Sequence, residues 1–165
     1  MKYFILFICC MALGAGSAVA QGKKSYGLSE RFIIPAISSG PVEAKMDTGA
    51  ETSSLGATNI ELFKKDGGDW VRFTPQVKGA KKVEMPIARH SRIKRRADGT
   101  GNTESIRRPV VMLEVCFDGK KHNIEVNLAD RSRFAYPLLI GSNAMIGFGV
   151  LIDPALNNQA SVSCP

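Results

Sequence analysis

The segment Ala44-Lys45-Met46-Asp47-Thr48-Gly49-Ala50-Glu51-Thr52-Ser53-Ser54-Leu55 runs from an apolar, strand-like approach through Asp-Thr-Gly into a turn rich in hydroxyl groups. Gly49 lets the backbone turn where a side chain would clash, so the strand can present the Asp47 carboxylate at its end. Three turn residues alone most often form only a turn. Here a second block, Pro137 to Met145, predicts a short apolar strand, a glycine and the start of a helix.

The two blocks together resemble those of the retropepsin-like aspartic proteases. The match is closer to a bacterial branch labelled "ATP-dependent zinc protease", which includes the ribosomal-protein-modification protease. The shared segments are Ala44 to Leu55, Trp70-Val71-Arg72-Phe73, Arg107-Arg108-Pro109-Val110-Val111, Leu138 to Gly141 and Asp153-Pro154. The resemblance extends from Gly27 to Pro154.

This resemblance implies an all-β fold, a retropepsin-like closed β-barrel with one short helix, and an aspartic endopeptidase activity. It implies that Asp47, Thr48 and Gly49 are catalytic, with Thr48 bracing the site and Gly49 and Ala50 contacting substrate. Peptide hydrolysis needs one group that takes a proton and another that gives one. The chain has a single Asp-Thr-Gly, so the second carboxylate would come from Asp47 of another copy in a homodimer.

The spacing of short apolar segments independently predicts an all-β barrel or sandwich. Val111, Leu113, Val115 and Phe117 alternate with polar residues, and Asp118-Gly119 is typical of a tight hairpin turn. His122, Ile124, Val126 and Leu128 would return on one face of the next strand. The only helix expected is short, around residues 142–146.

The 165 residues are enough for one compact domain. Lys2, an apolar run from Tyr3 to Leu13 and an Ala-x-Ala end at Ala20 predict a cleavable signal peptide over residues 1–20. A retained membrane anchor is the alternative, but the run is short for a spanning helix. We expect a linker over 21–28, the protease domain over 29–160, a tail over 161–165, and a periplasmic or secreted protein without a stable membrane anchor.

The formal net charge of +7 is concentrated in two basic arms around residues 97–102. These arms fall where retropepsins carry a flap over the substrate. The candidate substrate-binding residues are Arg89, Arg92, Lys94, Arg95, Arg96, Arg107 and Arg108. Guanidinium groups bind carboxylates in a bidentate manner, which favours an acidic peptide or protein substrate. The alternative is a solvated hairpin that keeps the protein soluble. Nucleic acid is disfavoured because no aromatic residues interleave the patch.

No metal and no cofactor are predicted. The sequence has neither His-Glu-x-x-His nor a Gly-x-x-x-x-Gly-Lys-Ser/Thr phosphate loop. Its two histidines, His90 and His122, are far apart and lack spaced ligands, so His122 is expected to be a satisfied core or edge residue. Cys116 and Cys164 could form a disulfide, or Cys116 could be a buried thiol; the residues favour neither.

The chain departs from the bacterial branch at two positions. Gly56 stands where the branch commonly has His, and Ser142 stands where an Arg usually follows Leu-Leu-x-Gly. In the viral relatives that Arg supports the catalytic loop through an acidic partner, for which Glu51 would be the candidate here. These departures motivate a rival hypothesis, a non-catalytic binding module of the same fold that uses its basic hairpin to hold an acidic partner.

Overall fold

The computed structural model describes residues 23–94 and 105–165. Its elements in chain order are β1 (Ser25–Tyr26), β2 (Ser29–Phe32), β3 (Val42–Asp47), β4 (Ser53–Lys65), β5 (Gly68–Pro75), β6 (Val83–Pro86), β7 (Arg89–Lys94), β8 (Ser105–Phe117), β9 (Lys120–Ala129), β10 (Leu138–Gly141), α1 (Ser142–Phe148) and β11 (Leu151–Ile152). The all-β expectation and the single short helix among the described residues are confirmed.

The main sheet has nine strands, with β2-β3-β10-β4-β9-β8-β7 in order and the β5–β6 pair attached to β4. β10 inserts between β3 and β4, parallel to β3 and antiparallel to β4. This insertion aligns Gly141 with Asp47. The two sequence blocks therefore meet at one point of the sheet, although almost a hundred residues separate them.

The expected closed barrel is wrong, because no sheet of the described residues closes. β2 and β7 are the two ends of the strand order, and β2 reaches β8 only through a bridge between Ile33 and Cys116. Pro35 follows closely after β2 and has no N–H to donate. β2 therefore stops before it can form a continuous ladder with β8.

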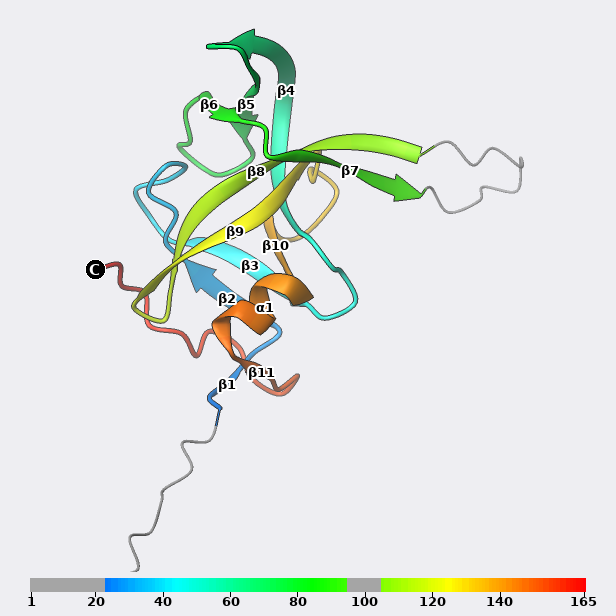
Figure 1. Ribbon diagram of the computed structural model, residues 1–165. Coiled ribbons are helices and arrows are strands. Elements are labelled where there is room, and N and C mark those ends of the chain that lie inside the picture. Colours follow the sequence, from blue (N-terminus) through cyan, green and yellow to red (C-terminus); the bar gives the residue numbers. More distant parts are fainter. Residues whose placement is uncertain (1–22, 95–104) are drawn as a thin grey trace, which may run out of the picture.

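The β8–β9 hairpin confirms the predicted alternation over part of its length, whereas Cys116 and Asn127, on the face expected to be polar, are buried. Val111, Val115 and Val126 are fully buried, whereas Met112 is half exposed. Asp118 and Gly119 both have positive φ, 48° and 75°, which is the conformation of the two-residue turns that match strand twist. In Figure 1 the beginning of β8, paired with β7, extends away from the body of the molecule.

An aromatic cluster fills one end of the core. Phe117 stacks on Phe32 with ring centroids 4.7 Å apart and also contacts Tyr26 and Phe148. The half-buried His122 packs edge-on against Phe148 at 4.6 Å. It is a packing residue at the border of the core, as expected.

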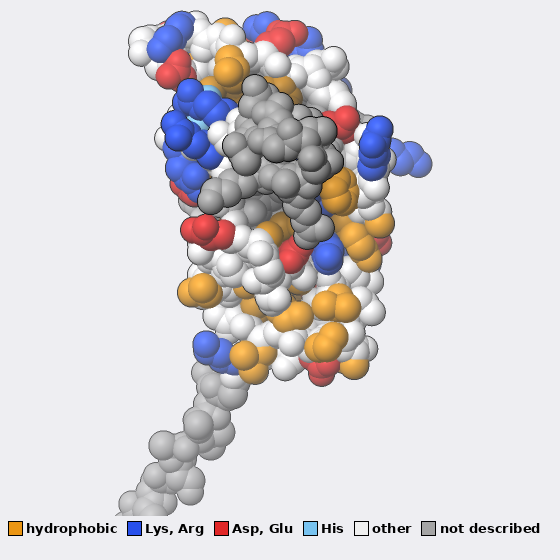
Figure 2. Space-filling view, turned by 90° about the vertical axis from the view of Figure 1, so that its right-hand side faces the viewer, with side chains coloured by type: hydrophobic (Ala, Val, Ile, Leu, Met, Phe, Trp, Pro, Cys, Tyr) orange, Lys and Arg blue, Asp and Glu red, His pale blue; other side chains and the backbone are white. Residues whose placement is uncertain are grey.

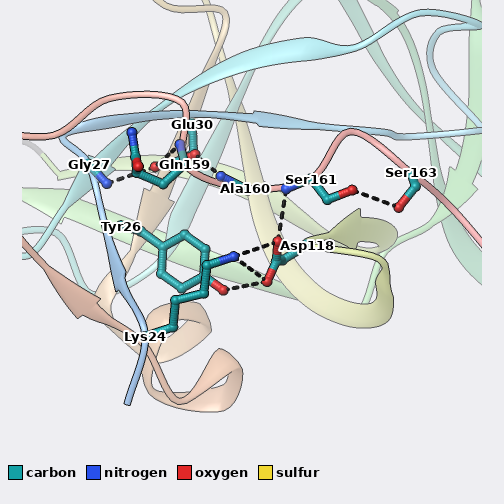
Figure 3. A network of polar contacts seen from close by, with 9 residues as sticks. All are labelled: Lys24, Tyr26, Gly27, Glu30, Asp118, Gln159, Ala160, Ser161 and Ser163. Carbon is teal, nitrogen blue, oxygen red and sulfur yellow. Dashed lines mark hydrogen bonds and ion pairs between the residues drawn. The ribbon is translucent and has the colours of Figure 1, made fainter. Parts of the chain in front are cut away.

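Both ends of the described chain are tied to this core (Figure 3). Residues 25 and 26, in the segment expected as a linker, pair with β11, and Tyr26 is buried. In the segment expected as a tail, Cys164 forms a disulfide with Cys116. The structure thus selects the disulfide from the two alternatives that the sequence left open.

Candidate active site

Asp47 is the last residue of β3, and its own loop holds its carboxylate. The Gly49 N–H donates to Asp47 Oδ1 at 3.1 Å, and the Ala50 N–H donates to the Asp47 carbonyl at 3.2 Å. The Asp47 side chain is 29% exposed, with Lys45 Nζ at 3.8 Å from Oδ2. The carboxylate is therefore oriented by the backbone but accessible from outside.

The start of α1 braces the same loop from the other side. Ser142 donates to the Ala50 carbonyl through both its N–H, at 2.7 Å, and its hydroxyl, at 3.1 Å. The Asn143 N–H donates to the Glu51 carbonyl at 3.2 Å. Gly141 permits this contact, because a Cβ there would lie 2.6 Å from the Glu51 carbonyl oxygen. The end of β10 and the start of α1 therefore position the loop, in addition to its own turn.

The other two predicted catalytic residues, Thr48 and Gly49, are exposed. Thr48 lines a shallow hollow of about 320 Å³ together with Met145, Ile146 and Leu151. Ile146 is 77% exposed and Leu151 is 50% exposed. Thr48 therefore lies beside an uncovered apolar surface rather than inside the molecule.

The predicted substrate-binding arginines have different environments. Arg89 forms an ion pair with Glu125 at 2.6 Å, and the same Nη2 also reaches the Thr52 hydroxyl at 3.3 Å. Arg92 and Arg108 line a cavity next to Ala50. Arg107 is exposed directly across the ladder from Arg92. Arg89 is thus a brace between β9 and the Asp47 loop.

Of the remaining predicted residues, Lys94 is the last residue of β7, and Arg95 and Arg96 lie outside the described residues. Figure 2 shows Lys and Arg side chains gathered along the left side of the upper half of the face that it draws. The exposed basic surface that the sequence indicates is therefore present on the described strands.

The model of a family described as "RimB-like: Retropepsin-like aspartic endopeptidase RimB" matches residues 25–161. This chain belongs to the RimB-like family. The resemblance inferred from the sequence is thereby confirmed.

Several relatives are longer proteins with a different name. A "Probable alpha-L-glutamate ligase" from Desulfotalea psychrophila is 31% identical over 139 residues, which is 81% of this chain and 29% of the relative. One of the same name from Shewanella pealeana is 30% identical over 138 residues, 83% of this chain and 30% of the relative. This RimB-like chain thus spans less than a third of their length.

A solved structure shares the fold. The crystal structure of a protein of unknown function from Legionella pneumophila superposes with a TM-score of 0.70 at 34% identity, covering 85% of this chain and 100% of that one. The fold of this RimB-like chain therefore has a counterpart in a solved structure.

The structure accounts for both departures from the RimB-like pattern. A side chain at Gly56 would meet Gln76 Oε1 at 2.7 Å, and that oxygen accepts the Arg131 N–H at 2.7 Å. Gln76 therefore occupies the space that a residue larger than glycine would need. Ser142 makes direct bonds to the loop that the missing arginine was expected to support.

Sequence reasoning missed Arg131, Ser91 and Glu125. Glu125 lies on the polar face of the predicted 122–128 strand, opposite Ile124. This position in the pattern could have identified it. Arg131 has no motif around it, yet it is buried at 8% exposure beside the cavity that Arg108 lines. Ser91 was hidden within the run of basic residues.

Across residues 23–94 and 105–165, no group of three or more His, Cys, Asp or Glu side chains is placed to hold a metal ion. In the same part of the chain, no helix combines the length and the apolar character that crossing a membrane requires.

Proposed function

We propose that this chain is an exported, homodimeric aspartic endopeptidase that hydrolyses peptide bonds with a water activated by Asp47 of both copies and that prefers acidic peptides. The observation that carries the proposal is the Asp47 carboxylate, partly exposed at the end of β3 in a loop braced by β10 and α1. Membership of the RimB-like family supports it.

In the proposed dimer one Asp47 is ionised and the other protonated, because two neighbouring carboxylates cannot both ionise. The ionised carboxylate takes a proton from water, whose oxygen attacks the carbonyl carbon, while the protonated one gives its proton to the carbonyl oxygen. The second carboxylate then takes a proton from the resulting diol. The first gives its proton to the leaving nitrogen as the C–N bond breaks, which restores the starting pair.

The surface around Thr48 supports a two-fold partner. Ile146 and Leu151 leave apolar area uncovered beside the loop, and exposed apolar patches commonly mark association surfaces. In Figure 2 hydrophobic side chains gather in the lower half of the face, at the height of α1 and β11. A copy related by two-fold symmetry on this surface would bring the two Asp47 loops toward each other.

Export and acidic preference have separate support. The signal-like sequence over residues 1–20 and the disulfide between Cys116 and Cys164 both fit an oxidising compartment. The basic strands β7 and β8 suit an acidic substrate. Relatives named for L-glutamate ligation add a link to glutamate.

The Asp47→Asn variant tests the proposal. We expect it to keep the fold, because the Asn side-chain oxygen can still accept from the Gly49 N–H, and to lose hydrolysis by more than about a hundredfold, because it cannot take the proton from water. Cleavage of an acidic peptide library by the mature chain is the measurement, with circular dichroism as the control for folding. Unchanged activity in the variant would exclude the mechanism.

Sedimentation across concentration between pH 4 and 7 tests the dimer. A dimer that strengthens where one carboxylate of the pair holds a proton is the expected result. A monomer under every condition would leave Asp47 without its partner.

A non-catalytic binding module of the same fold is the second candidate. The observation that favours it is that the charged partner of Asp47 within one described copy is Lys45, at 3.8 Å, and not a carboxylate. Binding of an acidic partner by a chain that remains monomeric and cleaves nothing would support this candidate.

A further inference from the structure

A cavity of about 420 Å³ opens between the Asp47 loop and the strands β7, β8 and β9. Ala50, Glu51 and Thr52 form its loop side. The other walls contain four arginines, which are Arg89, Arg92, Arg108 and Arg131. Glu51 is the one acidic residue among the described residues that line it, so the cavity has a strong excess of positive charge.

Arg131 is the most buried of these cations, at 8% exposure. Its Nε donates to the Tyr136 carbonyl at 3.1 Å. Burial and the nearby Arg108 lower the pKa of Arg131, and Asp47 raises it, so both charges lie within electrostatic reach. Within the described part of the chain, neither Arg131 nor Arg108 forms an ion pair with a carboxylate. The Arg131 guanidinium lies over the Phe134 ring, 4.7 Å from its centroid, and an anion would compensate the remaining cost of burying its positive charge.

Ser91 supplies an independent sign of a missing ligand. It is 9% exposed and lines the same cavity, and its hydroxyl has no hydrogen-bond partner among the described residues. Ser91 lies directly across the β7–β8 ladder from Arg108, where side chains on one face lie close together. Buried polar groups are rarely left unpaired, so this hydroxyl is available to an incoming polar group.

Asn127 holds Arg108 in place. Its Nδ2 donates to the Ser53 carbonyl at 2.9 Å, and its Oδ1 accepts the Ser54 hydroxyl at 3.1 Å and Arg108 Nη1 at 3.5 Å. The Asn127 side chain is thus fixed by the strand that follows the Asp47 loop. This long contact connects the Arg108 guanidinium to the strand that follows the loop.

We propose that Arg108, Arg131 and Ser91 form a subsite that binds one side-chain carboxylate of an acidic peptide beside the Asp47 loop. The proposal rests on the proposed function and assigns the acidic preference to these three residues rather than to the exposed basic side chains of β7 and β8. A carboxylate has two oxygens and can accept from both guanidinium groups and from the Ser91 hydroxyl. It would also neutralise the excess charge of the cavity.

Binding to the full mature chain carrying Asp47→Asn tests the subsite without cleavage. The probes are two short peptides that differ only in a central Glu or Gln, titrated by calorimetry. We expect the Glu peptide to bind about 10- to 100-fold more tightly, as for other charge-assisted hydrogen bonds. Arg108→Gln should remove most of this difference, and Ser91→Ala should reduce it several-fold. Arg131→Lys keeps the positive charge but loses the guanidinium fork, so it should also reduce the difference.

Arg133→Gln is the matched control, because Arg133 is an exposed arginine two residues from Arg131. Equal binding of the two peptides, or an equal loss in the Arg133 and Arg108 variants, would overturn the subsite. Displacement of the Glu peptide by an equal concentration of inorganic phosphate would overturn its assignment to a carboxylate.

The subsite and the proposed function can fail separately. Binding of the Glu peptide through Arg108 by a chain that hydrolyses nothing would support the subsite and refute the peptidase. Cleavage of Glu and Gln peptides at the same rate by the native chain, unaffected by Arg108→Gln, would support the peptidase activity and refute both the subsite and the acidic preference.

Discussion

At the scale of single residues, two carboxylates hold the ends of the described chain (Figure 3). Glu30 is fully buried and accepts the N–H groups of Gly27, Gln159 and Ala160. Asp118, in the β8–β9 turn, accepts from Lys24, the Tyr26 hydroxyl and the Ser161 N–H. Each carboxylate thus joins a segment from before β3 to one from after β11.

Asp118 should make the stability of the fold depend on pH. Burial raises its pKa, but the hydrogen bonds from Ser161, Lys24 and Tyr26 outweigh burial and lower the pKa to about 2. A depressed pKa stabilises the fold above the unfolded value of about 4, and this contribution is lost as the pH falls toward 2. Because the side chain is 25% exposed, we expect the contribution to be only about 1–2 kcal/mol.

Urea denaturation of Asp118→Asn between pH 6 and pH 2 measures this contribution. Asparagine tolerates the positive φ of this turn, so the variant should lose about 1–2 kcal/mol at pH 6 and converge with the native chain at low pH. Asp66→Asn is the control, since Asp66 also has a positive φ, 50°, in the β4–β5 turn. The same pH dependence in both variants would contradict the prediction.

At the scale of elements, the junction between β10 and α1 positions the Asp47 loop. Gly141→Ala would place a methyl group 2.6 Å from the Glu51 carbonyl oxygen and 2.8 Å from the Thr52 carbonyl carbon. Backbone atoms cannot yield as flexible side chains do, so we expect a loss of about 1–3 kcal/mol and lower activity from the displaced loop. Thermal denaturation and peptide hydrolysis measure the two effects.

Gly147→Ala is the control within the same helix. A Cβ at Gly147 meets nothing within 4 Å, and alanine favours a helix over glycine by up to about 1 kcal/mol. This variant should therefore be as stable as the native chain or more so. Equal destabilisation by both substitutions would show that the close approach at Gly141 does not matter.

At the scale of the whole molecule, the disulfide connects the core strand β8 to the last residues. Cys116 and Cys164 are 48 positions apart, and a cross-link over a loop of this length stabilises by about 3–4 kcal/mol in the chain-entropy model. Cys164→Ala should lose about this amount, because the remaining Cys116 is a buried thiol that packs as a small apolar residue. Denaturation with and without reductant measures it, and a native chain insensitive to reductant would contradict it.

The proposed dimer surface gives a second prediction at this scale. Ile146→Glu puts a charge into the apolar surface beside Thr48, so we expect dissociation of the dimer and loss of hydrolysis in parallel. Leu62→Glu is the control, since Leu62 is also largely exposed but lies on the β4–β5 hairpin. Sedimentation and activity are the measurements. A variant that stays dimeric at Ile146 would place the interface elsewhere.

The local pattern determined much of this protein. Alternation of apolar and polar residues over 111–128 predicted the β8–β9 hairpin, because strand side chains point to opposite faces in turn. Asp118-Gly119 predicted its turn, and Asp47-Thr48-Gly49 with the 137–145 block predicted the loop and its family. Each of these signals is a stretch of fewer than twenty neighbouring residues, and the family signal consists of two such stretches.

Only the tertiary structure decided which distant residues meet. It left the sheet open, paired Arg89 with Glu125, joined Cys116 to Cys164, and placed Arg131 and Ser91 in the cavity beside the Asp47 loop. The reason is that strand order and register fix these contacts across long separations. A pattern of local alternation specifies which face a side chain takes, but not which strand lies next to it.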